Sequence, residues 1–261
     1  SIAAIGLQGF TVFTPPGSQL GYDGVGQHSV GAVGVFRTGL DWESLAQARI
    51  FGPCAMVNSD YQQFAPNPAI AGGLRSTAND TIQYAQMIID RGWFDGERVL
   101  NEASIARLFT NETRGLPVYH SPWPPTHPLY PYGCDPDYAF GAWVLAENPQ
   151  TAHVEEIIGA GAWGSYIWID RRRALTGVLI TDVPAGSQSS TDAALGIFDI
   201  ARREIDSAQA GRLRAVQLGG DVCLSWNPAP GSSATRIHGA DAPIRDIFDL
   251  RAAVPLGQTT S

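Results

Sequence analysis

The sequence GAGAWGSYIWIDRRRALTGVLITD, residues 159–182, decides the fold of this chain. Two apolar runs, Tyr166–Asp170 and Leu175–Thr181, flank three consecutive arginines, and this pattern predicts a β-hairpin whose turn is solvated. A third strand-like run, Tyr138–Leu145, precedes the hairpin, and helical patterns lie before and after the three runs. Consecutive antiparallel strands flanked by helices predict an α+β domain.

Five segments are predicted to be helices. The best signal is Ser76-Thr77-Ala78-Asn79-Asp80, in which Thr77 caps the helix and Asp80 lies in its first turn. A carboxylate in the first turn interacts favourably with the helix dipole. The other predicted helices are Val25–Phe36, Trp42 to Phe51 after the cap Asp41, a short helix after Asn101, and Thr191 to Ser207.

Two further segments differ in composition from the rest. Between Gly115 and Asp137, prolines alternate with aromatic residues, so we expect no regular structure there but a functional or covering loop. After residue 208, short alternating strands resemble the opening of a fibronectin type III module. The predicted division is therefore a domain of residues 1–208 and a partial β segment of residues 209–261.

Composition excludes several classes of protein. The formal net charge is −8, which argues against a nucleic-acid or anionic-membrane partner, because binding phosphates needs clustered cations. No segment approaches the roughly 18 consecutive apolar residues of a membrane span. The cysteines and histidines show no metal-ligand spacing, and we expect neither metal nor organic cofactor. All 17 basic residues are arginines, so this chain cannot complete chemistry that needs a lysine amine.

Four segments in consistent order resemble the beta-lactamase-related serine hydrolases, a family of class C beta-lactamases, DD-peptidases and many carboxylesterases. They are Pro16–Tyr22 (PGSQLGY), Trp42–Met56 (WESLAQARIFGPCAM), Asn67–Asp80 (NPAIAGGLRSTAND) and Gly159–Asp170 (GAGAWGSYIWID). The resemblance covers about residues 10–207. It implies a beta-lactamase/transpeptidase-like fold, in which an antiparallel sheet has flanking helices and a helical subdomain.

The resemblance also implies a site. Tyr22 matches the family's tyrosine, a general base or proton shuttle for the nucleophilic serine, although residue type alone would make it an ordinary half-buried aromatic. Gly159, Gly161 and Ala162 match the active-site strand, where the Ala162 N–H would be one oxyanion donor. Three aromatic residues are expected either to line an acyl pocket or to pack as core or lid: Trp123, Tyr130 and Trp163.

Two departures from the family weaken the beta-lactamase interpretation. Gly24 stands where the family often has asparagine, and Gly159-Ala160-Gly161 lacks the lysine that would bind a beta-lactam carboxylate. The family's Ser-x-x-Lys nucleophile motif cannot be present, because the chain has no lysine. We therefore expect a C-terminal portion, truncated at both ends and inactive alone, of a hydrolase with ester or amide substrates.

Alternatives remain open. The chain is either part of such an enzyme or a non-catalytic binding protein with the same fold, and a minor third alternative makes Ser1 an N-terminal nucleophile. The expected partners are a small-molecule ester or amide and the missing N-terminal portion of the same protein. The type III-like tail suggests a secreted, periplasmic or cell-surface location.

Overall fold

The computed structural model describes four long stretches and four separate C-terminal strands, of which the backbone alone is described. They are residues 14–61, 68–120, 137–183 and 188–208, and then 212–218, 221–227, 234–239 and 254–260.

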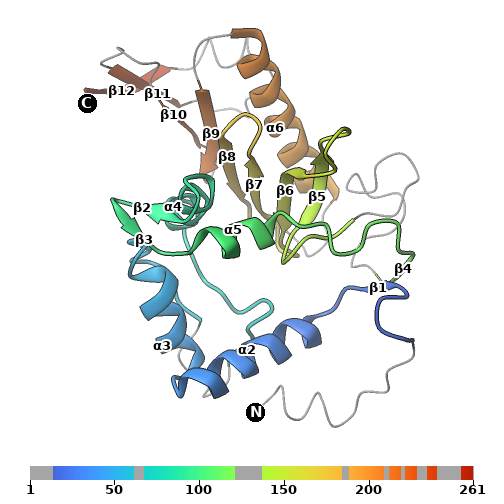
Figure 1. Ribbon diagram of the computed structural model, residues 1–261. Coiled ribbons are helices and arrows are strands. Elements are labelled where there is room, and N and C mark those ends of the chain that lie inside the picture. The colour runs from blue at the N-terminus through green and yellow to red at the C-terminus, as the bar shows by residue number, and fades with distance from the viewer. Residues whose placement is uncertain are drawn as a thin grey trace.

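A six-stranded sheet in the order β10-β9-β8-β7-β6-β5 is the frame of the molecule (Figure 1). The predicted hairpin forms, with Ser165 opposite Ile180 and Asp170 opposite Leu175. The antiparallel strands are β5 (Trp143–Glu147), β6 (Val154–Ala160), β7 (Ser165–Asp170) and β8 (Leu175–Ile180).

Three of the four C-terminal strands, β9 to β11, lie where the sequence predicts strands, and β12 was not predicted. The strand β9 (Arg212–Leu218) pairs in parallel with β8 and so extends the main sheet, and β10 (Asp221–Asn227) pairs antiparallel with β9. The strands β11 (Ala234–Gly239) and β12 (Val254–Thr260) pair with each other. The type III-like interpretation and the boundary at residue 208 remain predictions.

The sheet buries both faces because successive side chains of a strand point to opposite sides. On one side Ile157 packs in a cluster with Ala85 and Met87 of helix α4 (Ala78–Ile89). Its neighbour Ile158 packs in a different cluster, which includes Phe198 of helix α6 (Gln188–Ala208). The sheet is therefore the middle layer between α4 and α6.

The two helices within residues 24–46 lie away from α6 (Figure 1). The predicted caps Asp41 and Thr77 are confirmed, and Asn101 is also a cap: each accepts a hydrogen bond from a backbone N–H of the helix that follows. The helix expected to begin at Thr191 begins earlier, at Gln188. The remaining elements are β1 (Leu20–Gly21), α2 (Gly24–Thr38), α3 (Trp42–Ala46), the π-helical turn η1 (Gln47–Phe51), β2 (Trp93–Phe94), β3 (Glu97–Arg98), α5 (Glu102–Leu108) and β4 (Val118–His120).

Two expectations are wrong in part. The run Tyr138–Leu145 is not one strand, because Gly141, with a φ of 97°, turns the chain back so that Ala139 N–H donates to the Ala142 carbonyl. The proline-rich segment contains the short strand β4, since three consecutive residues without proline suffice to pair with β1.

Buried ion pairs fasten α6 to the sheet. Asp170, 1% exposed at the end of β7, accepts from Arg173 at 2.7 Å, and Arg173 also pairs with Asp206 of α6. Arg173 is therefore a partly buried structural residue, whereas Arg171 and Arg172 are exposed as expected.

A second pair lies one turn earlier in α6. Arg202 donates to Glu156 of β6 and sits 5.0 Å above the Trp168 ring, whose Nε1 also donates to Glu156. Burial raises the pKa of Glu156 above its ordinary 4.5, although Arg202 acts in the opposite direction. We call the set Asp170, Arg173, Asp206, Glu156 and Arg202 the α6 clamp.

The clamp predicts a large loss of stability when one of its cations is removed. Arg173→Met leaves the Asp170 carboxylate buried without its guanidinium, which should lower the free energy of unfolding by about 3–5 kcal/mol in urea titrations. The matched control is Arg203→Met, whose ion pair with Asp199 is exposed on both sides and should contribute within about 0.5 kcal/mol. Equal effects of the two substitutions would contradict the clamp.

The raised pKa of Glu156 predicts a pH dependence. The folded state holds the Glu156 proton more tightly than the unfolded state, so this group lowers stability as the pH rises from 4.5 through its raised pKa. Glu156→Gln keeps an acceptor oxygen and removes this contribution. Urea titrations at several pH values should show wild type losing stability relative to the variant as pH rises. Parallel pH profiles would show that Glu156 titrates normally.

Candidate functional site

Tyr22 lies at the junction of β1 and α2. The Leu20 N–H donates to the Pro117 carbonyl at 2.9 Å, which joins β1 to the segment entering β4. On the other side, the Asp23 carboxylate caps α2 by accepting from the backbone N–H groups of Val25 and Gly26. The backbone of Tyr22 is therefore fixed between a strand pair and a capped helix.

The ring of Tyr22 packs against two aromatic side chains from the edge of the sheet. Its centroid lies 5.6 Å from that of Tyr138, in an edge-to-face arrangement, and 5.2 Å from that of Trp143. Tyr138 also packs edge-to-face on Trp143, at 4.8 Å. These three residues form what we call the ring cluster. Aromatic pairs at such distances add stabilisation beyond the area they bury.

Tyr138 anchors the ring cluster. Its backbone N–H donates to Thr113 Oγ1 at 2.7 Å, and Gln27 of α2 makes a side-chain hydrogen bond to it. Burial is the main cause that raises the pKa of Tyr138, and the nearby Tyr22 hydroxyl adds to it. The ring cluster thus connects α2, β5 and the loop after α5.

The predicted oxyanion residues occupy the turn between β6 and β7. Gly159 lies in β6 and pairs with Ile167 of β7. The chain then turns at Gly161, whose N–H donates to the Ser165 carbonyl at 2.7 Å. The Gly164 carbonyl accepts from both the N–H and the hydroxyl of Thr181, each at 2.9 Å. We call residues 161–164, the turn that joins β6 to β7, the hairpin tip; it lies at the opposite end of β7 from the arginine turn. Ala162 and Trp163 are exposed there.

The structure brings Tyr22 and the base of the hairpin tip to one buried cluster. Tyr22 and Ala160, the residue before Gly161, both pack against the cluster that contains Trp143 and Ile158. Trp163 is 67% exposed, so its side chain is not part of the core. Trp123 and Tyr130 lie outside the described residues. The catalytic roles of Tyr22 and Ala162 remain predictions.

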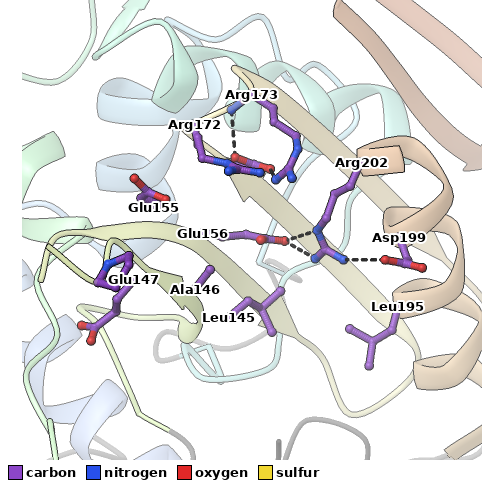
Figure 2. Close-up of a pocket in the computed structure, with 12 residues that line it drawn as sticks. Leu145, Ala146, Glu147, Glu155, Glu156, Arg172, Arg173, Leu195, Asp199 and Arg202 are labelled. Atoms are coloured by element: carbon purple, nitrogen blue, oxygen red, sulfur yellow. Dashed lines mark hydrogen bonds and ion pairs between the residues drawn. The ribbon is translucent and has the colours of Figure 1, made fainter. Parts of the chain in front are cut away.

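A charged pocket of about 630 Å³ lies elsewhere, between α6 and the β5–β6 edge. Figure 2 shows Arg202 pointing from α6 toward Glu156, with Asp199 on its other side. Its buried carboxylates, Glu156 and Asp170, are held by arginines of the α6 clamp. Of the predicted site residues that the structure describes, none lines this pocket, which we assign to the clamp.

Sequence reasoning missed both the clamp and the ring cluster. A carboxylate that ends an apolar strand, as Asp170 does, was a usable signal for a buried ion pair. Tyr138 and Trp143 gave no signal, because their contact with Tyr22 spans more than a hundred residues. Among the residues that the structure describes, no group of three metal-binding side chains occurs, and no helix is long and apolar enough to cross a membrane.

The hairpin tip depends on Gly164. Its φ is 83°, and an added Cβ would lie 2.1 Å from Thr181 Oγ1 and 2.6 Å from Val183 Cγ2. Gly141→Ala is the matched control, since Gly141 has a φ of 97° with nothing within 4 Å of the added atom. In urea titrations, Gly141→Ala should lower the free energy of unfolding by about 1–2 kcal/mol, because alanine disfavours a positive φ. Gly164→Ala should lower it by more, because its Cβ also clashes with two side chains. Equal losses of unfolding free energy in the two variants would show that the hairpin tip can shift to accommodate the added Cβ.

No protein-family model matches the sequence, and no curated protein matches it either. Solved structures do match the fold. A candidate beta-lactamase from Bacteroides dorei aligns with a TM-score of 0.58 and 22% identity over 66% of this chain, which spans 53% of that protein. A beta-lactamase from Mycobacterium bovis aligns with a TM-score of 0.57 and 19% identity, over 75% of this chain and 68% of the other.

A third solved structure widens this group. The octameric penicillin-binding protein homologue from Pyrococcus abyssi aligns with a TM-score of 0.51 and 15% identity, over 87% of this chain and 60% of the other. The chain thus spans about half to two thirds of the length of these proteins. At such identities the likeness establishes the fold: this chain has the mixed α/β, beta-lactamase-like fold that these structures share.

Proposed function

We propose that this chain is the part of a serine hydrolase that supplies Tyr22 and the hairpin tip, and that the complete site cleaves an ester or amide through an acyl-enzyme. Tyr22 would take the proton of the nucleophilic serine, and the Ala162 N–H would stabilise the oxyanion. The observation that carries the proposal is that Tyr22, held by the ring cluster, packs against the same buried cluster as Ala160 at the base of the hairpin tip, in a beta-lactamase-like fold.

The proposed chemistry needs a cation that this chain does not hold as lysine. A phenol with a pKa near 10 becomes a useful base at neutral pH only beside positive charge. Tyr138 and Trp143, whose rings pack on Tyr22, carry no charge. We therefore propose that the serine and its lysine come from a further segment, the N-terminal portion of the same protein.

The substrate proposal favours esterase or peptidase-like acyl transfer over beta-lactam hydrolysis. Gly24 provides no side-chain amide at the start of α2, and the hairpin tip offers no lysine for a carboxylate. The exposed Trp163 ring lies next to Ala162 and would contact an apolar acyl or leaving group. The reaction would need neither metal nor organic cofactor.

The absence of lysine equally favours a second function. A non-catalytic binding protein could keep the fold, the ring cluster and the hairpin tip without ever forming an acyl-enzyme. The type III-like tail would suit such a role outside the cytoplasm.

Tyr22→Phe separates the two functions. The phenylalanine keeps the ring in the ring cluster and removes only the hydroxyl, so folding should be unchanged. In the protein produced from its own gene, hydrolysis of a p-nitrophenyl ester should fall on the order of 10²–10⁴-fold. The matched control is Tyr119→Phe, which alters a tyrosine that is 68% exposed on β4 and should leave the rate unchanged.

The purified chain of residues 1–261 should show no turnover above the uncatalysed rate, because it has no lysine. Full activity in Tyr22→Phe would remove Tyr22 from the mechanism. If the protein from its own gene shows no turnover even with Tyr22 and Tyr119 both unsubstituted, the binding function is favoured.

A further inference from the structure

The hairpin tip is tied to the end of β8 through the Gly164 carbonyl. This carbonyl accepts two hydrogen bonds from Thr181, one from the backbone N–H and one from the hydroxyl, each at 2.9 Å. Thr181 follows β8 directly and lies 17 residues after Gly164 in the sequence. Since one of the two bonds comes from a side chain, the residue type at position 181 affects how firmly the tip is held.

The hairpin tip is a closed turn, so the position of Gly164 affects the position of Ala162. The Gly161 N–H donates to the Ser165 carbonyl at 2.7 Å, and the Gly164 N–H donates to the Gly161 carbonyl at 3.1 Å. Ala162 lies within this turn and is exposed. Within the described chain, its N–H donates to no acceptor. A displacement of the Gly164 carbonyl would therefore move an N–H that is available to a ligand.

Hydroxyl groups support the hairpin tip from behind. An added Cβ at Gly164 would lie 2.1 Å from Thr181 Oγ1 and 3.4 Å from Ser190 Oγ, so both hydroxyls lie against the turn. Ser190 of α6 is 5% exposed and is hydrogen-bonded to the hydroxyl of Tyr166 in β7 at 2.8 Å. The backing formed by α6 and β7 is thus held by its own hydrogen bond, and Thr181 makes the direct bond to the turn.

We propose that Thr181 is a positioning residue of the hydrolytic site, whose hydroxyl holds the hairpin tip so that the Ala162 N–H is in place for the developing oxyanion. The inference rests on the proposed function, in which that N–H stabilises the oxyanion. A donor is most effective when it is already fixed at the position where charge develops. A misplacement of about 1 Å can lower a rate on the order of 10²-fold. Thr181 therefore acts on the reaction through the tip, without touching the substrate.

Thr181→Val and Thr181→Ser test this role in the protein produced from its own gene. Valine keeps the shape of threonine without its hydroxyl, whereas serine keeps the hydroxyl. With rates normalised to the serines that a fluorophosphonate titrates, Thr181→Val should lower kcat for a p-nitrophenyl ester about 10- to 100-fold. KM should not change, because the lost interaction is made only in the transition state. Thr181→Ser should restore most of kcat.

Thr176→Val is the matched control. Thr176 lies in β8, a few residues before Thr181, and is fully buried. Its hydroxyl has no hydrogen-bond partner among the residues that the structure describes. Replacing an unpaired buried hydroxyl with a methyl group removes no favourable contact, so kcat and KM should both stay at their wild-type values.

Hydrogen exchange measures the hairpin tip independently of hydrolysis. In peptides that cover residues 159–166 of the same proteins, the amides of Gly161 and Gly164 should exchange faster in Thr181→Val than in wild type or Thr176→Val. Peptides from α4 should exchange at the wild-type rate in every variant, which separates a loosened tip from general destabilisation.

The two measurements distinguish failure of the positioning role from failure of the proposed function. Unchanged exchange at the tip, wild-type kcat in Thr181→Val, or a loss of kcat that Thr181→Ser does not restore would each overturn the positioning role, even where hydrolysis depends on Tyr22. Absence of hydrolysis by the wild-type protein, with faster exchange in Thr181→Val, would reject the proposed function and retain Thr181 as the residue that positions the tip.

Discussion

The two-sided burial of β6 and β7 is the constraint on which the rest of the structure depends. Neighbouring residues Ile157 and Ile158 point into different clusters, so the sheet must be covered by α4 on one side and α6 on the other. The α6 clamp then holds α6 on the sheet, because the buried carboxylates of Asp170 and Glu156 need their arginine partners. With both layers in place, the hairpin tip and the ring cluster have fixed positions at the end and edge of one sheet.

The sequence predicted what local rules control. The caps Asp41 and Thr77 form as expected, because each is a short polar side chain before a segment with helical apolar spacing, and the short helix after Asn101 also forms. The hairpin around the arginine turn forms because two β-branched and aromatic runs flank it. The helix at Val25–Phe36 is also confirmed, with its glycines at a packed crossing as their size requires.

Long-range contacts were beyond those rules. The strand β6 was recognised only at its end, since Glu156 interrupts its apolar pattern and is buried only because Arg202 arrives from α6. The ring cluster joins residues from three distant segments, and no local pattern predicts it. For the site, the sequence located Tyr22 and the hairpin tip, and the structure adds what holds each in place. Their catalytic roles are proposals that the fold supports.

The proposed chemistry leaves one gap. The chain has no lysine to supply the positive charge that a tyrosine base needs, so the proposed function requires that charge from outside residues 1–261.

Fluorophosphonate labelling, mapped by intact mass and peptide sequencing, tests the central claim most directly, because the reagent reacts with activated serines. We expect no adduct on purified residues 1–261, and in the protein from its own gene one adduct on the serine of a Ser-x-x-Lys sequence outside this chain. An adduct on any serine within residues 1–261 would contradict it, since the chain would then activate a nucleophile without a lysine.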